Sequence, residues 1–305
     1  MILVAGGSGF VGSAVVRALV GSGADVAVMT AHPERSRSRI ERMGARPVAG
    51  DVQHPATLPA AVEGAEVVVQ ALAFPTFPVE KPSKGYTFEE FEHLGTERLV
   101  TAAVAGGARR YVYASGVGAD PHGPAPRFRA KWAGEQAIAS SGIAEACVLR
   151  PSWVYGPEDR ALNRFVAIAR RSPVLPVVGA GTQRLQPVFV DDVGATLAEA
   201  ATPGGPAGTF EIGGPDVFTM NEILETMLSV MALRRKLAHV PPWTFVAAGF
   251  PAQYLPKPPI SPGMVEFLMS DAVANTAPLL RAFPDLRLTP LREGLATYLA
   301  PRVGG

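Results

Sequence analysis

The stretch Ala5-Gly6-Gly7-Ser8-Gly9-Phe10-Val11-Gly12 decides the fold of this chain. Residues 1–4 form an apolar run that predicts a strand, and apolar residues at helical spacing follow the stretch, so it is expected to join a strand to a helix. Gly6 permits a tight turn, Gly9 lets the backbone approach a pyrophosphate, and Gly12 allows close helix–strand packing. The stretch therefore predicts a dinucleotide-binding turn at a helix N-terminus. The alternative is a glycine-rich turn in some other α/β protein.

Composition limits the kinds of partner. The chain has 305 residues, 48% of them hydrophobic, and a net charge of +1, so neither disorder nor electrostatic binding to nucleic acid is expected. Small-molecule partners fit this composition better. The single cysteine, Cys147, cannot form an internal disulfide and lies in an apolar run, which predicts a buried core residue in a reducing compartment. With no signal-peptide pattern and no membrane-spanning run, we expect a cytoplasmic protein.

Strands alternate with helices through the first half of the chain. After the glycine stretch, strands are predicted at 25–29, 46–49, 66–70, 111–115 and 146–149. Helices are predicted at about 88–105 and at 130–140. Valine-rich strands between helices are typical of a parallel sheet buried on both faces. We therefore predict an α/β fold with a Rossmann-type doubly wound parallel sheet and a smaller, mainly helical C-terminal lobe. Residues 1–155, joined by 187–212, form the predicted dinucleotide domain, whereas 156–186 and 213–305 form the predicted substrate or partner lobe.

The end of the second strand bears on the choice of cofactor. An acidic residue there would bind the ribose 2′-hydroxyl of NAD, but the chain continues as Thr30-Ala31-His32. Arg35, Arg37 and Arg39 follow, and arginine suits a 2′-phosphate. We therefore favour NADP(H) over NAD(H), with His32 and Arg35 in the cofactor site. The alternative is a solvated basic helix face.

Further motifs in the chain occur in a recognisable order. They are Gly50-Asp51-Val52, Gly95-Thr96, Ser115, Lys131, Arg150-Pro151, Tyr155-Gly156-Pro157 and Gln186-Pro187-Val188-Phe189-Val190-Asp191-Asp192-Val193. Together with the glycine stretch, they resemble the short-chain dehydrogenase/reductase superfamily in its extended or atypical branch. The pattern is similar to the group of the nucleotide-binding accessory subunit of respiratory complex I, whose bacterial members are often described as NAD-dependent epimerase/dehydratase proteins.

The resemblance implies a cofactor contact at each matching position. The implied contacts are Gly6, Gly9, Phe10, Val11 and Gly12 at the phosphates, Asp51 and Val52 at the adenine, Ala71 and Leu72 at a ribose, Lys131 at the nicotinamide ribose, and Pro151, Trp153 and Val154 beside the nicotinamide. Ser115 would hydrogen-bond the substrate oxygen.

The chain departs from the family at the acid–base position. Active members carry a tyrosine four residues before the lysine, and here that residue is Arg127. A guanidinium stays protonated at neutral pH, so it can orient an oxyanion but cannot exchange a proton with it. Tyr155, which follows the sixth strand, is the substitute acid that we consider, and it completes the predicted catalytic set with Ser115 and Lys131.

Two functions follow from this pattern. In the first, an NAD(P)(H) molecule is bound as a structural or sensed cofactor; in the second, the chain is an NAD(P)H-dependent reductase or nucleotide-sugar epimerase/dehydratase with a non-standard acid. The five histidines are scattered, so no metal site is predicted. The apolar, proline-rich segment 240–259 is expected to be the core of the C-terminal lobe, a lid over a substrate pocket, or a surface for a protein partner or the inner face of a membrane.

Overall fold

The computed structural model describes residues 1–72, 74, 80–244 and 270–300. The chain divides into two compact units. The first unit comprises Met1–Pro151, Val190–Ile212 and Asn275–Arg287, and the second comprises Ser152–Phe189, Gly213–Ala274 and Leu288–Gly305.

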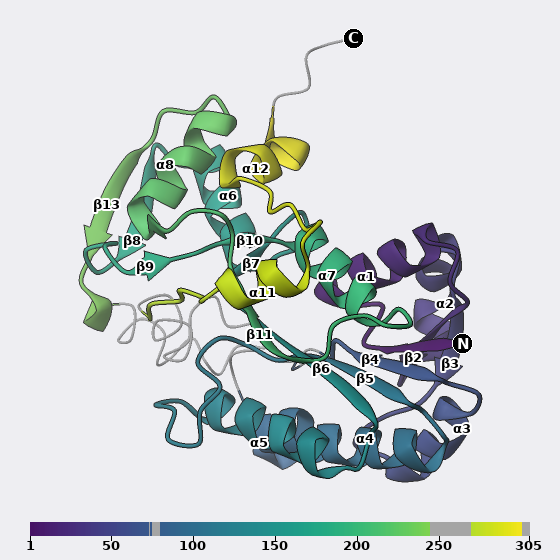
Figure 1. Cartoon of the computed structure of the whole chain (residues 1–305). Coiled ribbons are helices and arrows are strands. Elements are labelled where there is room, and N and C mark those ends of the chain that lie inside the picture. The colour runs from purple at the N-terminus through teal and green to yellow at the C-terminus, as the bar shows by residue number, and fades with distance from the viewer. Residues whose placement is uncertain (73, 75–79, 245–269, 301–305) are drawn as a thin grey trace. The chain divides into compact units, whose positions relative to one another are not determined.

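A parallel sheet of seven strands runs through the described part of the first unit (Figure 1). The strands are β1 (Ile2–Ala5), β2 (Val26–Thr30), β3 (Arg46–Ala49), β4 (Val67–Gln70), β5 (Arg110–Ala114), β6 (Glu145–Pro151) and β11 (Gly208–Ile212). Their order is β11-β6-β5-β4-β1-β2-β3, so the direction of winding reverses at β1. This confirms the predicted Rossmann-type topology. In such sheets, ligands bind outside the carboxyl ends of the strands near the reversal.

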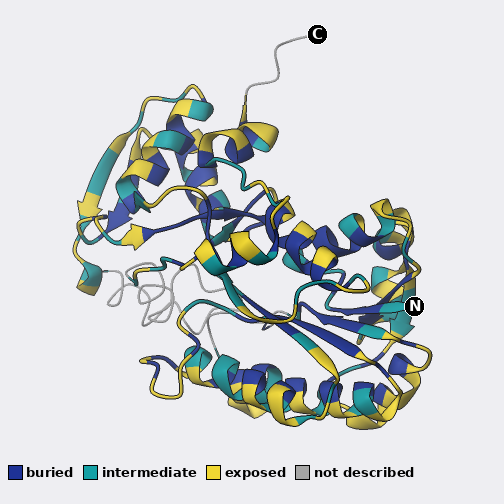
Figure 2. Cartoon of the chain, in the orientation of Figure 1, coloured by how far each residue is buried: buried dark blue, intermediate teal, exposed yellow. Residues whose placement is uncertain are grey.

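Helices cover both faces of this sheet (Figure 1). One face carries α1 (Phe10–Gly21), α2 (Pro33–Arg42) and α7 (Val190–Ala200), and the other carries α3 (Leu58–Val62), α4 (Gly95–Ala105) and α5 (Pro126–Ser140). The central strands are buried between these layers, as Figure 2 shows. Cys147 on β6 belongs to this core, as predicted, and burial raises the pKa of its thiol to about 12.

Two helices differ from the expected boundaries. Residues 88–105 were expected to form one helix, but a π-helical segment, η3 (Glu89–Leu94), precedes α4. The helix expected from residue 130 begins at Pro126, whose fixed φ suits the first helical position. Arg127 therefore lies in the first turn of α5, and Lys131 lies one turn later on the same side.

The described part of the second unit contains short strand pairs and three helices. The pairs are β7 (Val154–Tyr155) with β10 (Val188–Phe189), β8 (Val174–Val178) with β13 (Lys236–Val240), and β9 (Arg184–Leu185) with β12 (Phe218–Thr219); the helices are α6 (Leu162–Arg171), α8 (Met220–Val230) and α12 (Leu291–Leu299). We expected the chain after residue 215 to be helical, and β12 and β13 are exceptions. A short strand pattern is difficult to distinguish from a broken helix. In the first unit, α11 (Ala277–Ala282) packs on β11.

Asp159 is buried at the start of α6. Its carboxylate accepts hydrogen bonds from the backbone N–H groups of Ala161, at 2.8 Å, and Leu162, at 3.0 Å. Burial nevertheless dominates and raises the pKa of Asp159 to about 6. The hydroxyl of Tyr298, on α12, is also buried, and burial followed by the Asp159 charge raises the pKa of that phenol.

The raised pKa of Asp159 predicts a pH dependence of stability. The folded state holds this proton more tightly than the unfolded state, so the associated stability is fully present below about pH 4 and is lost as pH rises through about 6. Relative to Asp159→Asn, the wild-type free energy of unfolding should fall by about 3 kcal/mol over that interval. Urea denaturation of both proteins from pH 4 to pH 7 measures the difference, and parallel curves would contradict this prediction.

Candidate functional site

The turn between β1 and α1 has the geometry of an anion-binding turn. Gly6 has φ of +82°, and the N–H of Gly9 donates to the carbonyl of Gly6 at 2.9 Å. Helix α1 begins at Phe10 with no side-chain cap and no acidic residue in its first turn. The first backbone N–H groups of a helix have no intrahelical acceptor, so this end of α1 offers donors and a positive dipole to an anion.

Gly6, Gly9 and Gly12 differ in the space that surrounds them. A Cβ on Gly6 would lie 2.5 Å from the carbonyl oxygen of Ala71, and one on Gly12 would lie 2.2 Å from the carbonyl oxygen of Gly6. A Cβ on Gly9 would meet only the Gly6 oxygen, at 3.2 Å, and Gly9 has φ of −83°, which other residues adopt. The fold therefore requires Gly6 and Gly12, whereas Gly9 leaves space for a ligand. The residues after β4, Ala71 and Leu72, lie directly against this turn.

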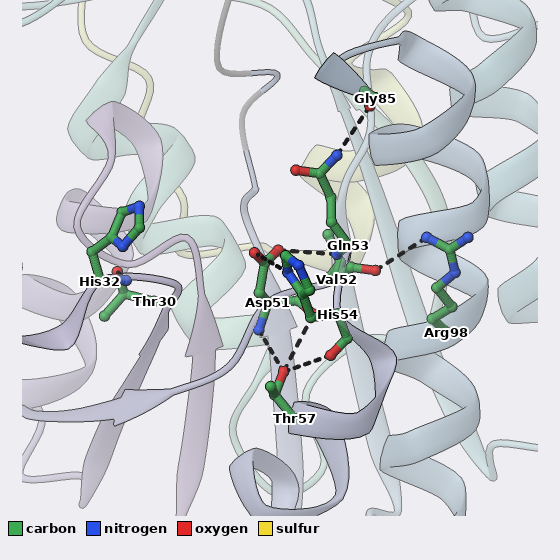
Figure 3. A network of polar contacts seen from close by, with 9 residues as sticks. All are labelled: Thr30, His32, Asp51, Val52, Gln53, His54, Thr57, Gly85 and Arg98. Atoms are coloured by element: carbon green, nitrogen blue, oxygen red, sulfur yellow. Dashed lines mark hydrogen bonds and ion pairs between the residues drawn. The ribbon is translucent and has the colours of Figure 1, made fainter. Parts of the chain in front are cut away.

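Asp51 and Val52 follow β3 in a closely bonded loop (Figure 3). The Asp51 carboxylate accepts from the N–H of Gln53 at 2.9 Å and lies 3.0 Å from Nδ1 of His54. The backbone N–H of Asp51 donates to Thr57 at 2.9 Å. The loop is thereby fixed at the carboxyl end of β3.

An arginine holds the next residue of this loop. Arg98 on α4 donates to the carbonyl of Val52 at 3.2 Å (Figure 3). It also pairs with Glu90 at 3.0 Å. Val52 itself is buried. Sequence reasoning named Asp51 and Val52 but missed Arg98, which comes from a helix 46 residues later and carries no sequence signal for this contact.

The arginines of the basic segment after β2 differ in their ion pairs. Arg37 pairs with Glu34 at 3.1 Å and with Glu41 at 3.4 Å, and these contacts raise the pKa of its guanidinium. Arg35 is exposed and makes no ion pair within the described residues. The backbone N–H of His32 donates a hydrogen bond to the hydroxyl oxygen of Thr30 at 3.3 Å (Figure 3). Arg35 and His32 are thus the side chains available at this strand end.

Ser115, directly after β5, donates a hydrogen bond to a buried carboxylate. Its hydroxyl donates to Glu135 of α5 at 2.5 Å, and Ser115 is only 7% exposed. Arg150 donates to the same carboxylate from Nε at 2.9 Å and from Nη2 at 2.5 Å. Because a serine hydroxyl has one proton, Ser115 presents only lone pairs to a ligand in this arrangement. Glu135 follows Lys131 by four residues, a helical spacing that could have drawn attention to it.

Lys131 is also paired with a buried carboxylate. Its Nζ lies 2.5 Å from Oε2 of Glu92 and donates to the carbonyl of Ala114 at 3.1 Å. The ammonium lies 5.0 Å from the ring centroid of Tyr113. Arg127, one turn earlier, stacks over Phe128, with 4.2 Å between Cζ and the ring centroid. Sequence reasoning did not identify Glu92.

The remaining predicted residues lie at and beyond the end of β6. Pro151 closes β6 in the first unit, whereas Trp153, Val154 and Tyr155 belong to the second unit. Tyr155 is fully buried, with its ring centroid 5.5 Å from that of Phe189. The structure brings together Ser115 and Lys131 within one unit; the catalytic role of Tyr155 stays a prediction.

The segment 240–259 is described only at its start. Residues 245–259 lie outside the described residues, and Trp243 is 70% exposed. No helix of the described ranges is long and apolar enough to cross a membrane. Within those same ranges, no group of His, Cys, Asp and Glu side chains is arranged to hold a metal ion.

Comparisons with known proteins agree with this fold and its turn. The chain is 30% identical over 303 residues to the mitochondrial NADH dehydrogenase (ubiquinone) 1 alpha subcomplex subunit 9 of Arabidopsis thaliana, covering 94% of this chain and 73% of that protein. It is 28% identical to a ceramide reductase of Caulobacter vibrioides, covering 93% and 89%.

Solved structures share the fold at lower identity. The UDP-glucose 4-epimerase of Thermotoga maritima has a TM-score of 0.77 and 19% identity, covering 98% of this chain and 97% of that one. The Citrobacter triphenylmethane reductase complexed with NADP(H) has a TM-score of 0.76 and 19% identity, covering 98% and 99%. The model of the NAD dependent epimerase/dehydratase family matches residues 2–213. This chain therefore belongs to the NAD-dependent epimerase/dehydratase family.

Proposed function

We propose that this protein binds NADP(H) in preference to NAD(H) as a structural or sensed cofactor and does not turn it over. The observation that carries the proposal is Arg127, which lies one helical turn before Lys131, where active relatives are expected to carry the proton-donating tyrosine. A guanidinium cannot donate its proton at neutral pH. The uncapped N-terminus of α1 and the space at Gly9 support dinucleotide binding.

Two further contacts support the absence of turnover. The Ser115 hydroxyl donates its hydrogen bond to Glu135, so it has no further proton with which to polarise a carbonyl oxygen. Tyr155, the substitute acid, is fully buried and packs on Phe189. The alternative function, an NAD(P)H-dependent reductase or epimerase, is favoured by the presence of both Ser115 and Lys131 and by the likeness to a named reductase.

The likeness to a subunit of NADH dehydrogenase supports a partner class for the first function. We propose that the partner is a respiratory enzyme complex. The protein would then be cytoplasmic or peripheral at the inner face of the membrane, and the cofactor would stabilise the surface that meets the partner. Small-molecule substrates belong to the alternative function.

Cofactor binding should depend on the absence of a side chain at residue 9. Gly9→Val is expected to fold, because φ there suits any residue, but its side chain would occupy the space of the pyrophosphate. The dissociation constant for NADPH should rise roughly 100-fold or more, measured by calorimetry. The control is Gly21→Val at the far end of α1, where a Cβ meets nothing within 4 Å. Unchanged affinity in Gly9→Val would refute the site.

Cofactor preference should depend on Arg35. Arg35→Gln should weaken NADPH binding about tenfold, the value of one charge-assisted hydrogen bond, and leave NADH binding unchanged. Arg37→Gln is the matched control, since Glu34 and Glu41 already hold that guanidinium. Fluorescence titration of both cofactors at two salt concentrations measures the effect. Wild-type binding of NADH as tight as that of NADPH at low salt would contradict the preference.

Turnover should be near background in the wild-type protein. A general acid positioned beside the substrate raises the reaction rate roughly 10²–10⁴-fold. The proposed function requires that this site hold no such acid. NADPH oxidation with a panel of carbonyl, quinone and nucleotide-sugar substrates measures this rate, alongside Tyr155→Phe. Wild-type turnover well above background that disappears in Tyr155→Phe would establish the alternative function with Tyr155 as the acid.

A further inference from the structure

Two of the three protons of the Lys131 ammonium group are already engaged within the protein. The ammonium lies 2.5 Å from Oε2 of Glu92 and donates to the carbonyl of Ala114 at 3.1 Å. An ammonium has three donors and no acceptor. One donor therefore remains for a ligand.

Backbone packing fixes the position of Glu92. The residue lies in the π-helical segment η3, and it is only 6% exposed. Helix α5 approaches η3 so closely that a Cβ on Gly134 would lie 2.4 Å from the carbonyl oxygen of Glu92. The same carbonyl accepts from the Thr96 hydroxyl at 2.7 Å. Glu92 is thus a fixed counter-charge and not a surface carboxylate that solvent separates from Lys131.

The other charged groups near the Lys131–Glu92 pair interact with one another. Glu135, four residues after Lys131, is matched by Arg150. The ring of Tyr113 lies beside the Lys131 ammonium. Burial first, and the Glu92 charge second, raise the pKa of the Tyr113 phenol well above the usual range. Glu135 first, and then Glu211 of β11 and Asp120 of the loop after β5, raise the pKa of the Arg150 guanidinium.

We infer that Glu92 is a positioning residue that neutralises Lys131, so that this lysine offers one hydrogen bond to a ribose hydroxyl of the bound cofactor and no net charge with which to ionise a neighbouring acid. The inference rests on the proposed function and deepens it. It gives a reason for the lack of turnover that is independent of the residue at position 127.

A phenol introduced at position 127 reports the charge on Lys131. Arg127 and Lys131 lie one turn apart on α5, so a tyrosine at 127 can approach the ammonium. In Arg127→Tyr, the new phenol should titrate near its ordinary pKa of about 10. Adding Glu92→Gln should lower that pKa by about two units, since the lysine charge then acts alone across about 6 Å. The pKa is measured from the ¹³Cζ resonance of labelled tyrosine, assigned by its absence from the parent proteins.

The matched control is Glu89→Gln in the Arg127→Tyr background. Glu89 is an exposed carboxylate of η3, and it pairs with His93. This substitution should leave the phenol pKa unchanged. Lys131→Met in the Arg127→Tyr background serves if the Glu92 variant does not fold, and it should raise the phenol pKa because Glu92 is left unpaired.

A phenol in Arg127→Tyr that already titrates near 8 would overturn the inference, as would a Glu92→Gln change that leaves the pKa in place. For the Lys131→Met variant, an unchanged phenol pKa would overturn it. These readouts do not involve turnover. The proposed function fails on cofactor binding or on wild-type turnover, neither of which enters these pKa measurements, so the two failures are distinguishable.

Discussion

Contact of backbone with backbone at the turn after β1 is the constraint on which the candidate site depends. The turn has no room for a side chain at Gly6 or at Gly12, because the carbonyls of Ala71 and Gly6 lie too close. This packing places the start of α1 beside the carboxyl ends of β1 and β4, where the winding of the sheet reverses. The unbonded N–H groups of that helix end therefore point to the edge where a ligand can lie.

Two buried carboxylates, each paired with a partly exposed cation, lie near Ser115 and Lys131 in the first unit. Glu92, Lys131, Glu135 and Arg150 form two close ion pairs. Removing one partner of a buried pair costs about 3–5 kcal/mol, so each of these residues is held in place by the other. The pairs connect η3 to α5 and α5 to β6, and they also fix the direction of the Ser115 hydroxyl. The same contacts that stabilise the layer thus set the chemistry available to a ligand.

The sequence predicted the sheet well because its information is local. Glycine spacing and valine-rich runs located β1 to β6 within one or two residues, since a strand buried on both faces must be apolar throughout. The π-helical segment η3 was missed, because its residues have an ordinary helical pattern. Glu92 and Arg98 were missed for another reason. Lys131 and Val52, their partners, are distant in sequence, and only the packing of η3 on α5 and of α4 beside the loop after β3 brings them together.

Binding and turnover of a dinucleotide place separate demands on such a chain. Binding relies on backbone groups, a helix dipole and the absence of side chains, none of which depends on the residue at position 127. Proton transfer relies instead on one acid and on the charge that tunes its pKa. A substitution at position 127, or a carboxylate such as Glu92 beside the lysine, can therefore end catalysis while the cofactor site stays intact. Because the two demands are separate, a chain of this fold can keep its dinucleotide site whether or not it keeps the acid.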